Sequence, residues 1–131
     1  MSAVTNSPGL GAYQATVRKG DLVRRDALPA VTQATNTTTA VTLNALKGAI
    51  TLQATLATDT GTSFTLNNTY ITPSSVILFN VASVSATADA TRDPVRVDIE
   101  GAPAAGSVVI HIHNLDANTT TAAPIIYFAI L

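Results

Sequence analysis

Residues 124–131 constrain the fold of this chain more than any other stretch. They read PIIYFAIL, carry no charge and are rich in β-branched and aromatic side chains, which is typical of a β-strand. Because side chains alternate along a strand, its two faces consist of Ile125, Tyr127, Ala129 and Leu131 on one side and Ile126, Phe128 and Ile130 on the other. Both faces are apolar, although a strand with one face in water normally alternates apolar with polar residues. The sequence therefore predicts a strand that is covered on both faces.

The face formed by Ile126, Phe128 and Ile130 needs a partner surface on energetic grounds. Burying one large apolar side chain contributes roughly 1.5–3 kcal/mol, so leaving all three in water forfeits about 5–9 kcal/mol. That loss is comparable to the whole stability of an ordinary domain, which is about 5–15 kcal/mol. We therefore predict that these three side chains contact a neighbouring subunit, with the chain's own N-terminal segment as the other candidate cover.

The overall composition also favours burial against other protein chains. The 131 residues are 47% hydrophobic but only 11% charged, whereas about 25% of residues are charged in a typical soluble domain. No window approaches the ~20 continuous apolar residues that a membrane helix requires, so we expect no membrane partner. The net charge is −1, so the chain lacks the excess of basic residues that is typical of a nucleic-acid-binding protein. We therefore expect the surplus apolar surface to lie between subunits.

From residue 29 onward, short strand-like runs alternate with turn residues, a pattern typical of all-β proteins. Several runs alternate apolar with polar side chains, as VRVDIE does at residues 95–100. Such alternation is typical of strands with one wet face in a two-sheet sandwich. For residues 29–131 the sequence predicts a jelly-roll-like antiparallel β-sandwich of about eight strands, at residues 30–34, 39–43, 49–56, 62–67, 75–81, 95–100, 107–113 and 123–131.

Residues 1–28 differ in residue pattern from the rest of the chain and are predicted to form an extended N-terminal arm. Four of the seven basic residues of the chain lie within eight positions there, without apolar periodicity. We interpret the segment as a clamp for an acidic surface, with a solvated flexible tail as the alternative. The predicted contact residues of the arm are Tyr13, Arg18, Lys19, Arg24 and Arg25.

An H-x-H motif places His111 and His113 on the same outward side of the strand at residues 107–113. Imidazole binds several transition metals, and three chains around a threefold axis would offer six such groups. The chain has no cysteine and no other histidine, so histidine and cysteine side chains of one copy cannot supply a complete set of metal ligands. The sequence therefore predicts no bound metal and no cofactor, and it leaves this pair as the one candidate metal site.

The sequence predicts that the protein is not an enzyme. Asp98 and Glu100 share a strand face beside Arg96, which is typical of a charge-paired outer face rather than of the two carboxylates of a glycosidase. No G-x-S-x-G nucleophile motif and no phosphate-binding glycine loop is present.

Most of residues 31–131 resembles a module of tailed-bacteriophage virion proteins. The resemblance covers about three quarters of the chain and rests on the opening VTQATNTTTAVTLNALKGAITLQATLATDTGTSFTLNN, on VILFNV, on VVIHIHNL and on the closing IIYFAIL. Similar modules occur in capsid decoration proteins of the cement and head-fibre kinds and in other phage structural proteins. The resemblance implies a β-sandwich that assembles as a homotrimer, with an arm or a face in contact with the virion shell.

Together, these expectations describe a phage capsid decoration protein that is assembled in the host cytoplasm and lies on the outer capsid surface. Its partners would be two further copies of itself and the major capsid protein, and its role would be to stabilise the shell by bridging capsid subunits. Two alternatives remain open: a fibre or adhesion domain that binds a host surface glycan, and a coat subunit of the virion.

Overall fold

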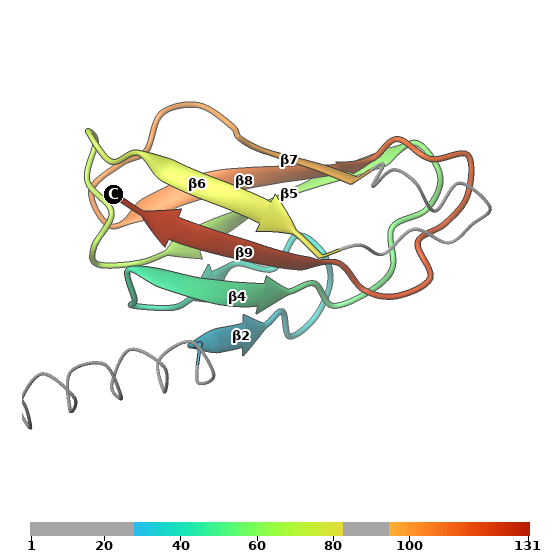
Figure 1. Cartoon of the computed structure of the whole chain (residues 1–131), viewed down its shortest axis with the longest axis horizontal. Helices are drawn as coiled ribbons and strands as arrows, with labels where there is room; N and C mark the ends of the chain where they lie inside the picture. Colours follow the sequence, from blue (N-terminus) through green and yellow to red (C-terminus); the bar gives the residue numbers. More distant parts are fainter. Residues whose placement is uncertain (1–27, 83–94) are drawn as a thin grey trace, which may run out of the picture.

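The computed structural model describes residues 28–82 and 95–131, which form eight β-strands and no helix (Figure 1). Each strand overlaps one of the eight runs predicted from the sequence, so the all-β class is confirmed. The strands are β2 (Ala30–Thr32), β3 (Val41–Thr42), β4 (Lys47–Thr51), β5 (Thr60–Asn67), β6 (Ile77–Val81), β7 (Val95–Ile99), β8 (Ser107–Asn114) and β9 (Ile125–Ile130).

The strands form two four-stranded sheets, in the orders β2-β4-β9-β6 and β3-β5-β8-β7. We call them the first and the second sheet; in Figure 1 the first sheet lies in front of the second. Among the eight described strands, only β7 and β8 are consecutive strands of one sheet, so each other pair of consecutive strands is split between the two sheets. This interleaving ties the two sheets into one β-sandwich.

The interleaving also corrects the expectation of wholly antiparallel sheets. β2 pairs with β4, and β3 with β5, in parallel, while the other four pairings are antiparallel. Parallel neighbours need a crossover connection, and here each crossover is a strand of the opposite sheet. Both sheets are therefore mixed, which departs from the antiparallel neighbours expected throughout a jelly roll.

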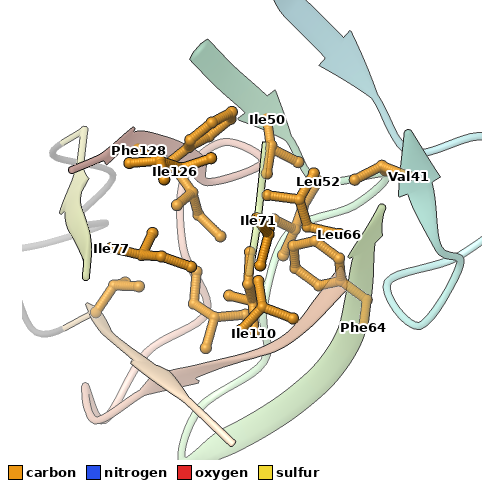
Figure 2. Close-up of a cluster of buried hydrophobic side chains, with 14 of the residues drawn as sticks. Val41, Ile50, Leu52, Phe64, Leu66, Ile71, Ile77, Ile110, Ile126 and Phe128 are labelled. Atoms are coloured by element: carbon orange, nitrogen blue, oxygen red, sulfur yellow. The ribbon is translucent and has the colours of Figure 1, made fainter. Parts of the chain in front are cut away.

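A single hydrophobic core fills the space between the sheets (Figure 2). Ile50 and Ile126 of the first sheet meet Ile110 and Ile112 of the second, and all four side chains are fully buried. On β7 and β8 the predicted alternation is confirmed. Val108, Ile110 and Ile112 of β8 are buried in this core, while both histidines of β8 and Arg96 and Asp98 of β7 face outward.

The predicted subunit contacts of the last strand are corrected by this core. Ile126, Phe128 and Ile130 are only 0%, 3% and 8% exposed, because they face the second sheet of their own chain. The chain itself therefore covers the face that we assigned to another subunit. The face of β9 that lacks such a cover is the opposite one, which includes Tyr127.

Buried amide side chains hold the loops at the ends of the sandwich. Asn114, the last residue of β8, is fully buried and lies 2.9–3.1 Å from the carbonyl oxygens of Leu56, Ala57 and Asn118 through its Nδ2. Its Oδ1 accepts a hydrogen bond from the backbone N–H of Asp116. One side chain thus pairs backbone groups of two loops that have no strand partner, as buried polar groups require.

Candidate functional site

Strands β6 and β9 lie next to each other in the first sheet (Figure 1). Their outward face carries a run of apolar side chains. Since Ile126, Phe128 and Ile130 point inward, alternation turns the residues between them outward, and the register places outward residues of β6 beside them. We call this surface the apolar strip. Its members are Val76, Leu78, Ile125, Tyr127, Ala129 and Leu131.

Four members of the apolar strip are strongly exposed. The exposed fractions are 55%, 54%, 38% and 75% for Val76, Leu78, Tyr127 and Leu131. Within the described ranges these are four of the seven large apolar residues that are exposed, the others being Leu46, Tyr70 and Leu115. A contiguous apolar patch bordered by polar groups is typical of a protein–protein interaction site.

Polar residues border the apolar strip. Lys47 and Thr51 of β4 lie along one side, and Asn80 of β6 is the cross-strand neighbour of Tyr127. Lys47 is the only charged residue among the strands of the first sheet. A shallow groove of about 200 Å³ runs over β6 and β9 beside Leu78 and Tyr127. An apolar centre with a polar rim is the usual anatomy of a protein interface.

A larger hollow, of about 530 Å³, lies where the described chain begins. Leu28, Pro29, Leu46, Lys47 and Tyr70 line it, together with Asn44 and Ala45. It adjoins the apolar strip, because Lys47, which lines it, is the cross-strand neighbour of Ala129. Of the predicted arm, only Leu28 falls within the described residues.

The outward face of the second sheet is mostly polar and charged instead, with Val109 of β8 as an apolar residue within it. Arg96 and Asp98 of β7 are exposed and lie opposite His113 and His111 of β8 in the register. Glu100, directly after β7, is also exposed. The predicted solvent-exposed, charged face of β7 is therefore confirmed.

Each histidine of the H-x-H motif is hydrogen-bonded through one ring nitrogen. The Nδ1 of His111 lies 2.9 Å from the Oγ of Ser63, its cross-strand neighbour on β5. The Nε2 of His113 lies 3.2 Å from Oδ1 of Asp59, which precedes β5. The ring centroids are 6.0 Å apart and the rings are nearly perpendicular. Asp59 has a left-handed backbone, with φ of 46°, which Asp tolerates better than most residues.

The contact between Ser63 and His111 lacks, among the described residues, the carboxylate that completes a Ser-His-Asp triad. In a Ser-His-Asp triad the second ring nitrogen donates to a carboxylate that orients the base. The Nε2 of His111 makes no such hydrogen bond to the described residues. No group of three or more His, Cys, Asp or Glu side chains with metal-binding geometry occurs in residues 28–82 and 95–131 either.

Sequence reasoning located the two histidines but not their surroundings. Ser63 and Asp59 are 48 and 54 positions away from the histidines that they contact, so no local sequence motif predicts these two contacts. Only the register of β5 against β8 brings them together. The predicted arm contacts Tyr13, Arg18, Lys19, Arg24 and Arg25 lie outside the described residues.

No protein-family model matches this chain, and no curated protein or solved structure is significantly similar to it. Among the described residues there is no helix of the length and apolar character needed to cross a bilayer.

Proposed function

We propose that this protein is a tailed-phage capsid decoration protein that assembles as a homotrimer and stabilises the outer shell by bridging capsid subunits. The observation that carries the proposal is the apolar strip, because it supplies the surface that self-association needs. The resemblance of residues 31–131 to phage virion modules supplies the setting and the trimeric state.

The energetics of the apolar strip support self-association. Leu78, Tyr127 and Leu131 are at least one third exposed, and full burial of a large apolar side chain contributes roughly 1.5–3 kcal/mol. In a symmetric trimer each copy contributes the same strip, so this gain recurs at every interface. The uncharged character of the strip favours a partner that is equally apolar, and a second copy of the chain meets that condition.

Attachment to the shell is assigned to the remaining surfaces. With the apolar strips turned toward one another, the charged outward faces of the second sheets stay accessible to water or to the shell. The arm, with Arg18, Lys19, Arg24 and Arg25, is proposed to contact the major capsid protein. Bridging two shell subunits adds interface that opposes their separation, and three arms per trimer strengthen binding through avidity.

The test is binding of the purified protein to phage heads that lack it. The wild-type chain is expected to sediment with the heads, and a Leu78→Lys/Tyr127→Lys variant is expected to lose both the trimer and most of its binding. Leu115→Lys is the matched control, because Leu115 is 51% exposed but lies outside the apolar strip.

Deletion of residues 1–28 should abolish attachment and leave the sandwich folded. Full binding of the truncated protein refutes the role of the arm. Failure of the wild-type chain to bind heads, combined with a positive glycan-array signal, refutes decoration in favour of adhesion.

A further inference from the structure

The two histidines of β8 present their unused ring nitrogens to one point on the outward face of the second sheet. His111 uses Nδ1 for Ser63, and His113 uses Nε2 for Asp59, which leaves Nε2 of His111 and Nδ1 of His113. Neither of these nitrogens makes a hydrogen bond to the described residues. A Cβ built at Gly61 would lie 3.0 Å from the first and 3.2 Å from the second.

The hydrogen bonds of the rings suit metal binding. The Asp59 carboxylate accepts a hydrogen bond from the Nε2–H of His113, so in the neutral ring Nδ1 carries the lone pair. When His111 Nδ1 donates to the Ser63 hydroxyl, the Nε2 of His111 likewise carries a lone pair. Metal-binding histidines almost always donate their other N–H to a carboxylate, a carbonyl or a similar acceptor, which fixes the tautomer and the ring orientation.

Gly61 keeps the space between the two rings open. It is the cross-strand neighbour of His113, and any side chain there would meet the rings, since its Cβ would lie 2.9 Å from Cε1 of His111. No real Cβ makes so short a contact without displacing its neighbour. The absence of a side chain at position 61 thus allows both rings to approach the same position above the sheet.

We propose that His111 Nε2 and His113 Nδ1 bind one divalent transition-metal ion of the zinc, nickel or copper type above Gly61, with Ser63 and Asp59 as positioning residues. Metal–nitrogen bonds are about 2.0–2.1 Å long, so binding draws the two rings together by rotation of their side chains. Water or a ligand from another molecule fills the remaining coordination positions. This inference is independent of the proposed function.

The charges around the pair are mixed. Asp98 lies beside His111 and Arg96 beside His113 in the register, and the Asp59 carboxylate contacts His113 directly. Two acidic groups against one basic group leave the surroundings favourable to a cation. Imidazole ligands select zinc, copper and nickel over calcium and magnesium, which prefer oxygen.

The experiment is a calorimetric titration of the untagged full chain with Zn²⁺ and, separately, with Ca²⁺. These are the only two histidines and there is no cysteine, so one Zn²⁺ per chain and no heat with Ca²⁺ are expected. His111→Ala and His113→Ala should each abolish Zn²⁺ binding. Asp59→Ala and Ser63→Ala should weaken it by about 10–100-fold, the usual effect of removing a group that orients a ligand.

Gly61→Ala is the sharpest variant, because it removes no ligand and should still weaken Zn²⁺ binding at least tenfold by displacing the rings. Thr65→Ala, four positions further along the same face of β5, is the matched control and should bind like the wild type. Far-UV circular dichroism establishes that each variant is folded.

Ring nitrogen NMR identifies the atoms that bind. Zn²⁺ should move the ¹⁵N signals of His111 Nε2 and His113 Nδ1 far more than those of the hydrogen-bonded nitrogens. Zn²⁺ binding that survives the double His→Ala change, equal binding of Ca²⁺, no binding at all, or ligation through the other ring nitrogens would each overturn the proposal.

Discussion

The two outward faces of the sandwich differ although the two sheets are built alike. Each sheet has four strands, and the central strands β8 and β9 share the same alternation of buried and partly exposed residues. On β8 and its neighbours most outward positions are charged or polar, with Arg96, Asp98 and His111 among them and Val109 as the apolar exception. On β9 and its neighbours they form the apolar strip, next to a single charged residue, Lys47.

This contrast shows which constraint acts on which face. The inward faces must be apolar for the chain to fold, so they are alike and say nothing about function. The outward faces are free of that constraint, and the difference between them reflects what each face contacts. A face rich in charge suits water, whereas Leu78 and Tyr127 suit a protein surface.

The largest predicted effect separates two adjacent residues of β9. Ile126→Ala should lower the free energy of unfolding by about 2–5 kcal/mol, because Ile126 is fully buried in the core and the change leaves a cavity. Tyr127→Ala should change the stability of the isolated subunit far less. Denaturant unfolding at low protein concentration measures both, and equal losses would mean that the faces of β9 are assigned wrongly.

A second effect concerns the polar end of the β8 core face. Asn114→Leu should cost about 1–3 kcal/mol, because the carbonyls of Ala57 and Asn118 lose their side-chain donor. The buried carbonyl of Leu56 should contribute less, since it still accepts a hydrogen bond from the backbone N–H of Thr120. The same unfolding measurement checks this value, with Leu115→Ala as a control beyond the end of the strand; an unchanged midpoint would show that Asn114 holds no loop.

A third, smaller effect distinguishes the outward faces through assembly. The thermal midpoint of the wild-type chain should rise with protein concentration, since association stabilises the folded state by mass action. For Tyr127→Lys the midpoint should be independent of concentration. Leu115→Lys should behave like the wild type, and a loss of concentration dependence in that control would mean that any added charge disrupts assembly.

The smallest effect belongs to the charged face of the second sheet. Asp98→Asn should change the free energy of unfolding by no more than about 0.5 kcal/mol, as is usual for exposed positions. It should leave the oligomeric state unchanged. Calorimetry and light scattering of the same sample test both expectations, and dissociation of the assembly by this change would move the interface to the second sheet.

Much of the fold was predictable because it depends on local pattern. Turn residues separate the strands, and the alternation of β7 and β8 identifies which side chains face the core. The order of the strands was not predictable, because the parallel pairing of β2 with β4 depends on crossovers through the opposite sheet.

The orientation of β9 was predicted wrongly for a definable reason. With both faces apolar, alternation defines two sets of side chains but not which set faces the core. The inward set contains Ile126, Phe128 and Ile130, whereas the outward set includes the small Ala129 and Tyr127. A tyrosine hydroxyl requires a hydrogen-bond partner when it is buried, so this side chain was the available signal.

The surroundings of the histidines were not predictable from spacing either. Gly61, Ser63 and Asp59 come near them only through the register of β5 against β8, and that register is a property of the folded sheet. The H-x-H motif alone therefore identified the two histidines but not the groups that contact them.

We propose that copies of this chain cover one another's apolar strips. Sedimentation equilibrium of the full-length wild-type chain measures this most directly. A mass of three chains, reduced to one chain by Leu78→Lys/Tyr127→Lys and retained by Leu115→Lys, is the predicted result. A wild-type chain that remains a monomer across the accessible concentrations, with Leu78 and Tyr127 in water, would contradict it.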